Sequence, residues 1–129
     1  MTGQRDIPEK CEGVEHLSAS ARYSAQGLVR LWREAAFRQE IVAAALVLVA
    51  HGLLGSRVEV WLAQGVLILL LLAVEALNTA VEVIVDHVSP DYSESARHAK
   101  DLGSLAVLFL LLANGLCLFA SVADWIRGG

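Results

Sequence analysis

The sequence contains an uninterrupted apolar run, 66–74, that leads directly into a regularly spaced set of polar residues. Glu75, Asn78, Glu82 and Asp86 follow at intervals that place them along one face of a helix. A carboxylate in the hydrocarbon core of a bilayer costs roughly 3 kcal/mol on insertion scales, so such residues usually face a protein interior or a watery site. We therefore expect a membrane-spanning helix that carries a functional acidic stripe, defined by these four residues.

The composition supports a membrane protein and excludes several other classes. Hydrophobic residues make up 56% of the 129 residues and aromatic residues only 6%, so the apolar content is mostly Leu, Val and Ala. The mean hydropathy of +0.55 is too high for an ordinary soluble domain of this length. The net charge of −4 and the absence of a Lys/Arg cluster argue against nucleic-acid binding. Cys11 and Cys117 lie in very different settings, which predicts neither a disulfide nor a cysteine metal site.

The sequence predicts an all-α chain with one membrane domain, 17–129, after a mobile polar tail, 1–16, that lacks the apolar core of a signal peptide. An amphipathic helix containing Trp32 suits the headgroup plane of a membrane; the alternative is a soluble helix that packs on a partner. Gly55 is expected in a short turn, and Pro90 is expected to end the second span. The expected surface helix and three spans cover, in order, about 17–33, 34–54, 58–87 and 101–125.

The distribution of Lys and Arg predicts the orientation of the chain. Most of these residues lie in the N-terminal region, and two more, Arg97 and Lys100, lie in the loop 87–101. The short loop between the first two spans has Arg57 alone, and the C-terminus has Arg127 alone. The positive-inside rule therefore places the N-terminus and the 87–101 loop in the cytoplasm. The acidic stripe then opens toward cytoplasmic nucleotide.

The donors of this stripe predict a hard, oxygen-preferring cation. Mg²⁺ is usually held by one or two carboxylates together with waters and substrate phosphates, and Glu34 could join Glu82 in such a site. The sequence has no Gly-rich phosphate loop, so Lys100, beside Asp101, is the candidate for binding phosphates. Glu75 lies about two turns deeper in the membrane, where partial desolvation would make it a general base toward an alcohol.

Three segments, 34–40 (EAAFRQE), 75–82 (EALNTAVE) and 99–104 (AKDLGS), resemble the signatures of the prokaryotic diacylglycerol kinase family. The resemblance extends from Tyr23 to Trp125, with one residue fewer between Tyr23 and Glu34 than is usual in that family. It implies a multi-pass homotrimer of the bacterial inner membrane, with sites shared between protomers. It also implies transfer of a phosphoryl group from ATP to the hydroxyl of a membrane lipid. The form of segment 34–40 favours diacylglycerol, which would be converted to phosphatidic acid.

Matching residue by residue, the resemblance implies a set of roles. Glu75 would be the general base, and Glu34 and Glu82 would hold Mg²⁺. The residues implied to bind nucleotide are Tyr23, Glu34, Asn78, Glu82, Asp91, Tyr92, Glu94, Lys100 and Asp101. The residues implied to bind the lipid are Phe37, Arg38, Gln39, Glu40, Glu75 and Ser104.

Alternatives remain at this stage. Undecaprenol is a second candidate substrate, because the same catalytic set would serve either alcohol. Buried acids could instead relay protons or ions in a non-enzymatic membrane subunit, although that function would require neither Glu34 nor Lys100. Glu40 is either a charge at the membrane boundary or a contact to a lipid headgroup. Asn114, in the third span, is expected to hydrogen-bond between helices rather than to serve the site.

Overall fold

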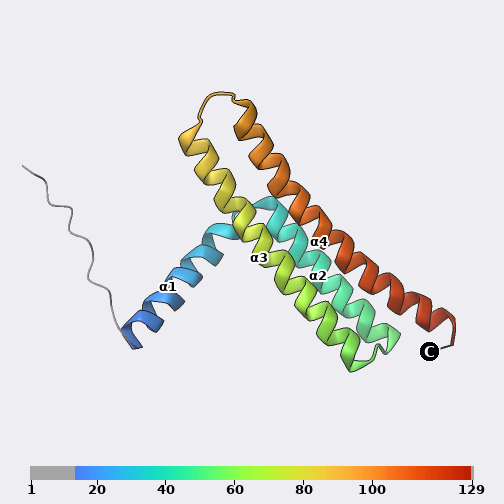
Figure 1. Cartoon of the computed structure of the whole chain (residues 1–129). Helices are drawn as coiled ribbons and strands as arrows, with labels where there is room; N and C mark the ends of the chain where they lie inside the picture. The colour runs from blue at the N-terminus through green and yellow to red at the C-terminus, as the bar shows by residue number, and fades with distance from the viewer. Residues whose placement is uncertain (1–13, 129) are drawn as a thin grey trace, which may run out of the picture.

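The computed structural model describes residues 14–128, and this part of the chain forms helices without any strand (Figure 1). The all-α prediction is therefore confirmed. Three of the helices are long and apolar enough to cross a membrane. The elements, in chain order, are α1 (Val14–Leu31), α2 (Ala35–Leu54), α3 (Val58–Val88) and α4 (Glu94–Ile126).

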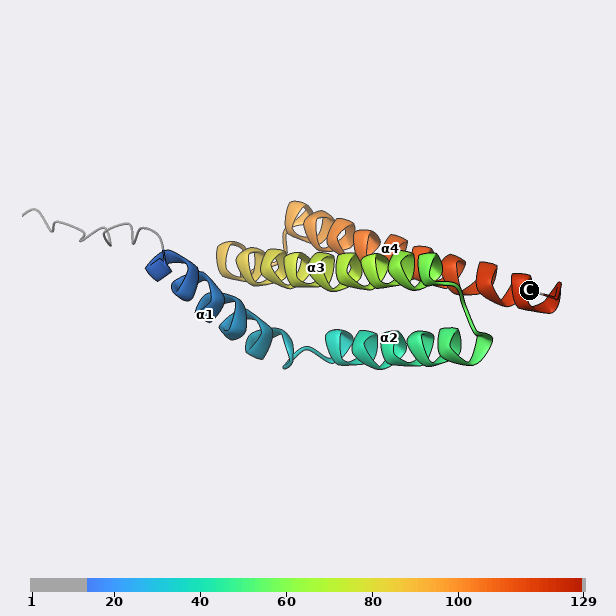
Figure 2. The ribbon, with the colours of Figure 1, turned by 90° about the horizontal axis from the view of Figure 1, so that it is seen from below.

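The three long helices run side by side, and α1 leaves them at an angle (Figure 1). α3 packs mainly against α4, whereas α2 lies alongside this pair with looser packing (Figure 2). Most large apolar side chains on the three long helices are exposed, as expected where lipid rather than protein covers them. Few apolar side chains are buried among the described residues, and more polar than apolar side chains are buried. These buried polar residues are the candidates for a functional site.

The ends of α2 and α3 follow the local sequence. Gly55 ends α2 in the left-handed conformation, with φ of 64°, and the Ser56 N–H donates to the His51 carbonyl at 3.1 Å. α3 ends at Val88, two residues before Pro90, which cannot continue a helix. The turn predicted at Gly55 and the stop predicted at Pro90 both occur in the structure.

The polar segment between the last two apolar spans is partly helical. α4 begins at Glu94, because the Ser93 hydroxyl accepts a hydrogen bond from the Ala96 N–H at 3.1 Å and caps the helix. The hydropathy pattern placed the start near residue 101, since it registers the apolar span and not the polar turns before it. Residues 94–101 are therefore helical.

The amphipathic helix is displaced relative to its expected range. α1 begins at Val14 rather than at residue 17 and ends at Leu31 rather than at residue 33. Its end is followed by a turn over Trp32 and Arg33, after which Glu34 precedes the first residue of α2. The prediction of a mobile tail falls mainly on residues 1–13, which lie outside the described residues.

Candidate active site

Polar residues from each of the three long helices meet in a cavity of about 420 Å³, here called the acidic cavity. α3 contributes three residues of the acidic stripe, α2 contributes the segment around Glu40, and α4 contributes Ser104. The cavity thus brings together residues that the sequence places more than sixty positions apart, from Glu34 to Ser104. Its lining comprises Glu34, Ala36, Gln39, Glu40, Ala43, Glu75, Asn78, Thr79, Glu82, Ser104, Val107 and Leu111.

Two carboxyl groups lie at the base of the acidic cavity. Glu75 is only 4% exposed and Glu40 only 6% exposed. Glu75 interacts electrostatically with Glu82 and Glu34, and Glu40 interacts in the same way with Glu75. Within the described part of the chain, Glu40 Oε2 is buried without a hydrogen-bond partner. Buried acids without partners are expensive, so this arrangement indicates a site that binds something polar.

Asn78 lies between the two helices that pack most closely. Its side-chain Nδ2 donates to Glu82 Oε1 at 3.2 Å. Its Oδ1 is buried and has no partner among the described residues. Gly103 of α4 faces this oxygen, and a Cβ at that position would overlap it. The approach of α4 to α3 therefore holds an unpaired carbonyl oxygen beside the carboxylate of Glu82.

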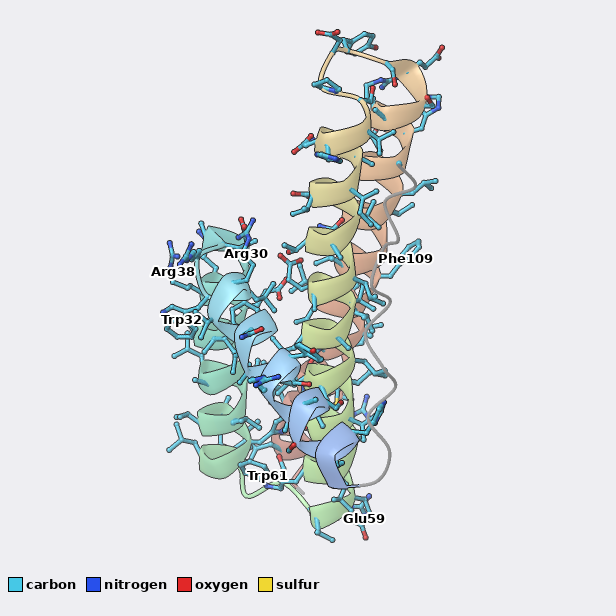
Figure 3. All side chains as sticks on the ribbon, turned by 90° about the vertical axis from the view of Figure 1, so that its left-hand side faces the viewer. Arg30, Trp32, Arg38, Glu59, Trp61 and Phe109 are labelled. Carbon is cyan, nitrogen blue, oxygen red and sulfur yellow. The ribbon has the colours of Figure 1, made fainter. Side chains whose placement is uncertain are left out.

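The turn between α1 and α2 positions Glu34 at the mouth of the cavity. Arg30 of α1 forms an ion pair with Glu34, with Nη1 and Oε1 2.5 Å apart. Arg38 donates from Nη1 to the carbonyls of Trp32 and Arg33, at 2.9 and 3.0 Å, and so stabilises the turn. Figure 3 shows Arg30 and Arg38 beside the end of α2 that lies away from Glu59 and Trp61, while α3 and α4 extend further beyond it.

A second cavity, of about 330 Å³, lies where α3 connects to α4 and is here called the connector cavity. It contains the fourth residue of the stripe, Asp86, whose carboxylate lies 2.5 Å from the Lys100 ammonium. Arg97 pairs with Asp101 at 3.6 Å. Four residues implied to bind nucleotide line this cavity: Asp91, Tyr92, Lys100 and Asp101. Its mixture of cationic, acidic and aromatic groups suits a nucleotide more than a lipid chain.

Several residues expected at the site lie elsewhere. Phe37 is buried and lines a third, apolar cavity of about 730 Å³ between α1 and α3. Tyr23 is exposed on α1, with the Arg22 guanidinium 5.7 Å from its ring centroid, and lines none of these cavities. Glu94 lies in the first turn of α4, where it pairs with His98 at 3.9 Å. Arg38 serves the α1–α2 turn rather than either cavity.

The sequence interpretation missed one polar residue of the acidic cavity. Thr79 is buried there, one helical turn after Glu75 on the same face of α3. The spacing i, i+4 from Glu75 could have identified it.

Among residues 14–128, no three side chains of His, Cys, Asp or Glu converge closely enough to form a metal site by themselves. The expected donors nevertheless fit Mg²⁺ chemically. Glu34 and Glu82 supply carboxylate oxygens to the acidic cavity, and the unpaired Oδ1 of Asn78 is a further hard oxygen donor. Such a set leaves room for waters and substrate phosphates, as Mg²⁺ commonly requires.

Fold and site together define a multi-pass helical membrane protein with an acidic, oxygen-rich cavity and a second cavity of mixed charge where α3 connects to α4. This combination is typical of an enzyme that works on a lipid with a charged co-substrate. The model of the family described as prokaryotic diacylglycerol kinase matches residues 22–122. The chain belongs to the prokaryotic diacylglycerol kinase family; it is a membrane lipid kinase that uses ATP as co-substrate.

Curated relatives agree with this assignment. The chain is 48% identical over 114 residues to a diacylglycerol kinase of a Sinorhizobium species, covering 88% of this chain and 83% of the relative. It is 39% identical over 103 residues to the diacylglycerol kinase of Escherichia coli, covering 78% of this chain and 83% of the relative. It is 37% identical over 109 residues to that of Haemophilus influenzae, covering 83% and 92%.

Proposed function

We propose that this lipid kinase transfers the γ-phosphoryl group of ATP to the primary hydroxyl of diacylglycerol and so forms phosphatidic acid and ADP. The observation that carries the proposal is the buried carboxylate of Glu75 at the base of an acidic cavity, within a helix long enough to span a membrane. A lipid hydroxyl can reach such a base from the bilayer. The names of the relatives supply the choice of diacylglycerol.

Glu75 is proposed as the general base. Its carboxylate accepts the proton of the lipid hydroxyl while that oxygen attacks the γ-phosphorus. The bond between this phosphorus and the bridging oxygen breaks, and ADP leaves with the bonding electrons. Because phosphoryl transfer depends mostly on positioning and charge neutralisation, one base and a few fixed charges are sufficient.

Glu34 and Glu82 are proposed to hold Mg²⁺, which when bound neutralises charge on the transferring phosphate. Both line the acidic cavity, and Asn78 donates a hydrogen bond to Glu82 that orients its carboxylate. In this structure the carboxylate of Glu34 is paired with the Arg30 guanidinium, so we expect this ion pair to separate when a cation binds.

The other proposed nucleotide contacts are divided between the two polar cavities. Lys100, with three ammonium donors, is proposed to bind phosphates, and Asp101 and Asn78 to orient the nucleotide. Asp91 and Tyr92 line the same cavity as Lys100 and would face the remainder of the nucleotide. Tyr23 and Glu94 line neither polar cavity, so a contact from them requires a second protomer or a movement of α1 or the connector.

The lipid is proposed to lie across the acidic and apolar cavities. Gln39, Glu40 and Ser104 line the acidic cavity around Glu75 and would contact the headgroup. Phe37 lines the apolar cavity, whose walls suit an acyl chain. Arg38 lies in the first turn of α2, between Phe37 and Gln39 in the sequence, and would act at the membrane boundary.

The assembly is proposed to be a homotrimer with shared sites, in a bacterial inner membrane with the N-terminus and the connector facing the cytoplasm. Two observations support it. The nucleotide candidates of a single chain are spread over two cavities and the exposed face of α1. The excess of Lys and Arg lies before α2 and around the connector.

A transfer assay tests the proposal. Labelled ATP is offered with diacylglycerol or undecaprenol in mixed micelles, with and without Mg²⁺, to the intact chain and to Glu75→Gln. Glu59→Gln is the matched control, because Glu59 is an exposed acid at the other end of α3. The expected result is Mg²⁺-dependent label in diacylglycerol that Glu75→Gln loses and Glu59→Gln keeps. Label in undecaprenol alone would overturn the choice of substrate, and label in neither lipid would overturn the proposed function.

A further inference from the structure

The half of the bundle remote from the acidic cavity contains a row of buried hydrogen bonds that joins all three long helices. His51 Nε2 of α2 lies 3.2 Å from Gln64 Oε1 of α3, and Gln64 Nε2 donates to Asn114 Oδ1 of α4 at 2.6 Å. His51 and Gln64 are completely buried, and Asn114 is 7% exposed. The side chains of His51, Gln64 and Asn114 are called the hydrogen-bond chain below.

Each link of the hydrogen-bond chain has a defined direction. Gln64 Oε1 can only accept, so His51 Nε2 carries the proton; in the neutral imidazole His51 Nδ1 then accepts from the Ser56 hydroxyl at 2.9 Å. At the other end, Asn114 Nδ2 donates to the carbonyls of Leu110 at 2.8 Å and Leu67 at 3.2 Å. Each side-chain nitrogen and oxygen of His51, Gln64 and Asn114 therefore has a hydrogen-bond partner. The acidic cavity differs, because it contains buried oxygens without one. A fully satisfied network in a membrane joins helices and does not await a ligand.

The hydrogen-bond chain is the principal polar attachment of α2. Among the described residues, His51–Gln64 is the one hydrogen bond between a side chain of α2 and either α3 or α4. Only Phe37, Glu40 and His51 are buried in α2, so packing elsewhere along this helix is sparse. In lipid, hydrogen bonds and close packing hold helices together because hydrophobic burial does not favour association there.

On each long helix, the residue of the hydrogen-bond chain lies eleven positions from a residue in or beside the acidic cavity. Glu40 and His51 are eleven residues apart in α2, and Gln64 and Glu75 are eleven apart in the antiparallel α3. Asn114 is likewise eleven residues from Gly103, which faces Asn78. Eleven residues make about three helical turns and rise about 17 Å, so each pair shares a face. A rotation or a slide of α2 at His51 would therefore be carried along the helix to Glu40.

We propose that His51, acting through Gln64 and Asn114, is a positioning residue that sets the rotation and depth of α2 and so places Glu34 and Glu40 opposite Glu82 and Glu75. The inference rests on the function proposed above for the acidic cavity. It assigns a role in the reaction to a row of residues about 17 Å from the reacting groups. Displacements of about 1 Å in a catalytic site can cost on the order of 100-fold in rate.

The test compares three forms of the full chain with the wild type. Gln64→Leu removes the partner of both His51 and Asn114 at similar volume. The exchange His51→Gln/Gln64→His restores a polar pair between α2 and α3. The control is Ser121→Ala, because this buried hydroxyl donates only within α4, to the Cys117 carbonyl at 3.2 Å. If Gln64→Leu does not insert, His51→Asn, which is too short to reach Gln64, replaces it.

The first readout is the Mg²⁺ concentration for half-maximal transfer, measured together with kcat. We expect Gln64→Leu to raise that concentration and to lower kcat by about tenfold or more, because Glu34 and Glu82 no longer face each other correctly. The exchanged pair should recover most of both values, and Ser121→Ala should keep them. An unchanged Mg²⁺ midpoint in Gln64→Leu would overturn the proposal.

The second readout requires no activity. Spin labels at the exposed Leu46 of α2 and Leu69 of α3, in labelled chains diluted with unlabelled ones and with both cysteines replaced, report the distance between these helices. Gln64→Leu should broaden the distance distribution, and the exchanged pair should narrow it again. An equally narrow distribution in Gln64→Leu would refute the positioning role. Absence of transfer in the wild type, by contrast, would refute the proposed function and leave this distance test valid.

Discussion

Gly103 of α4 leaves the space that the side-chain carbonyl of Asn78 occupies on α3, since a Cβ at that glycine would overlap Asn78 Oδ1. We therefore expect Gly103→Ala to displace Asn78, to weaken its bond to Glu82, and to lower kcat/KM for ATP by about tenfold or more. The same overlap should cost roughly 1–3 kcal/mol of stability. Transfer assays and thermal unfolding of the purified variant measure both effects.

Gly115→Ala is the matched control for this substitution. Gly115 also lies in α4, but a Cβ there meets nothing within 4 Å, so only helix propensity changes. That change favours the helix by up to about 1 kcal/mol. Equal losses of activity in the two variants would show that crowding at Asn78 is not the cause.

The ion pair between Lys100 and Asp86 predicts different outcomes for its two members. Both side chains are well exposed, at 40% and 66%, so the pair itself should contribute about 0–1 kcal/mol to stability. We expect Lys100→Met to lower kcat/KM for ATP by on the order of 100-fold, because a phosphate-binding charge is lost. Asp86→Asn should leave kcat/KM within a few-fold of wild type, as measured by ATP titration at saturating lipid. A loss in Asp86→Asn as large as that in Lys100→Met would indicate that Asp86 contacts the nucleotide itself.

Glu75→Gln should abolish transfer while the helices and the assembly persist. The amide has nearly the same volume but cannot accept the hydroxyl proton, and losing a general base typically costs 10²- to 10⁴-fold. Circular dichroism and sizing by light scattering check the fold, and Glu59→Gln serves as the control acid on the same helix. Turnover near that of the wild type would remove Glu75 from the proposed mechanism.

The sequence was sufficient to predict the helices, apart from some of their ends, and the α3 residues of the acidic stripe that line the acidic cavity. A long apolar run and a spacing of three or four residues determine both the span and the face on which Glu75, Asn78 and Glu82 lie. The contribution of α2 to the acidic cavity was identified through the resemblance of its motif, because periodicity alone does not tell which face of α2 meets α3. The expected interhelical role of Asn114 is confirmed by its bonds to Gln64 and to the Leu67 carbonyl.

Features that depend on local caps and on helix register could not be predicted. Ser93 starts α4 several residues before its apolar part, which places Glu94 in a helix rather than in a loop. The turn at Trp32 directs α1 away from the bundle and leaves Tyr23 exposed. Gln64 was overlooked because a single amide in an apolar run has no visible partner until antiparallel α2 and α4 are aligned with α3.

Removal of the metal is the last prediction, and it concerns Glu34 and Glu82 together. If both carboxylates hold Mg²⁺, chelation by EDTA should stop transfer, and added Mg²⁺ should restore it. Glu82→Gln and Glu34→Gln should each raise the Mg²⁺ concentration for half-maximal activity by about tenfold or more, since each removes one anionic ligand. Asp124→Asn, at the far end of α4, is the control and should leave this concentration unchanged. A loss of kcat at an unchanged Mg²⁺ midpoint in both glutamate variants would instead indicate that these residues act on the substrate directly.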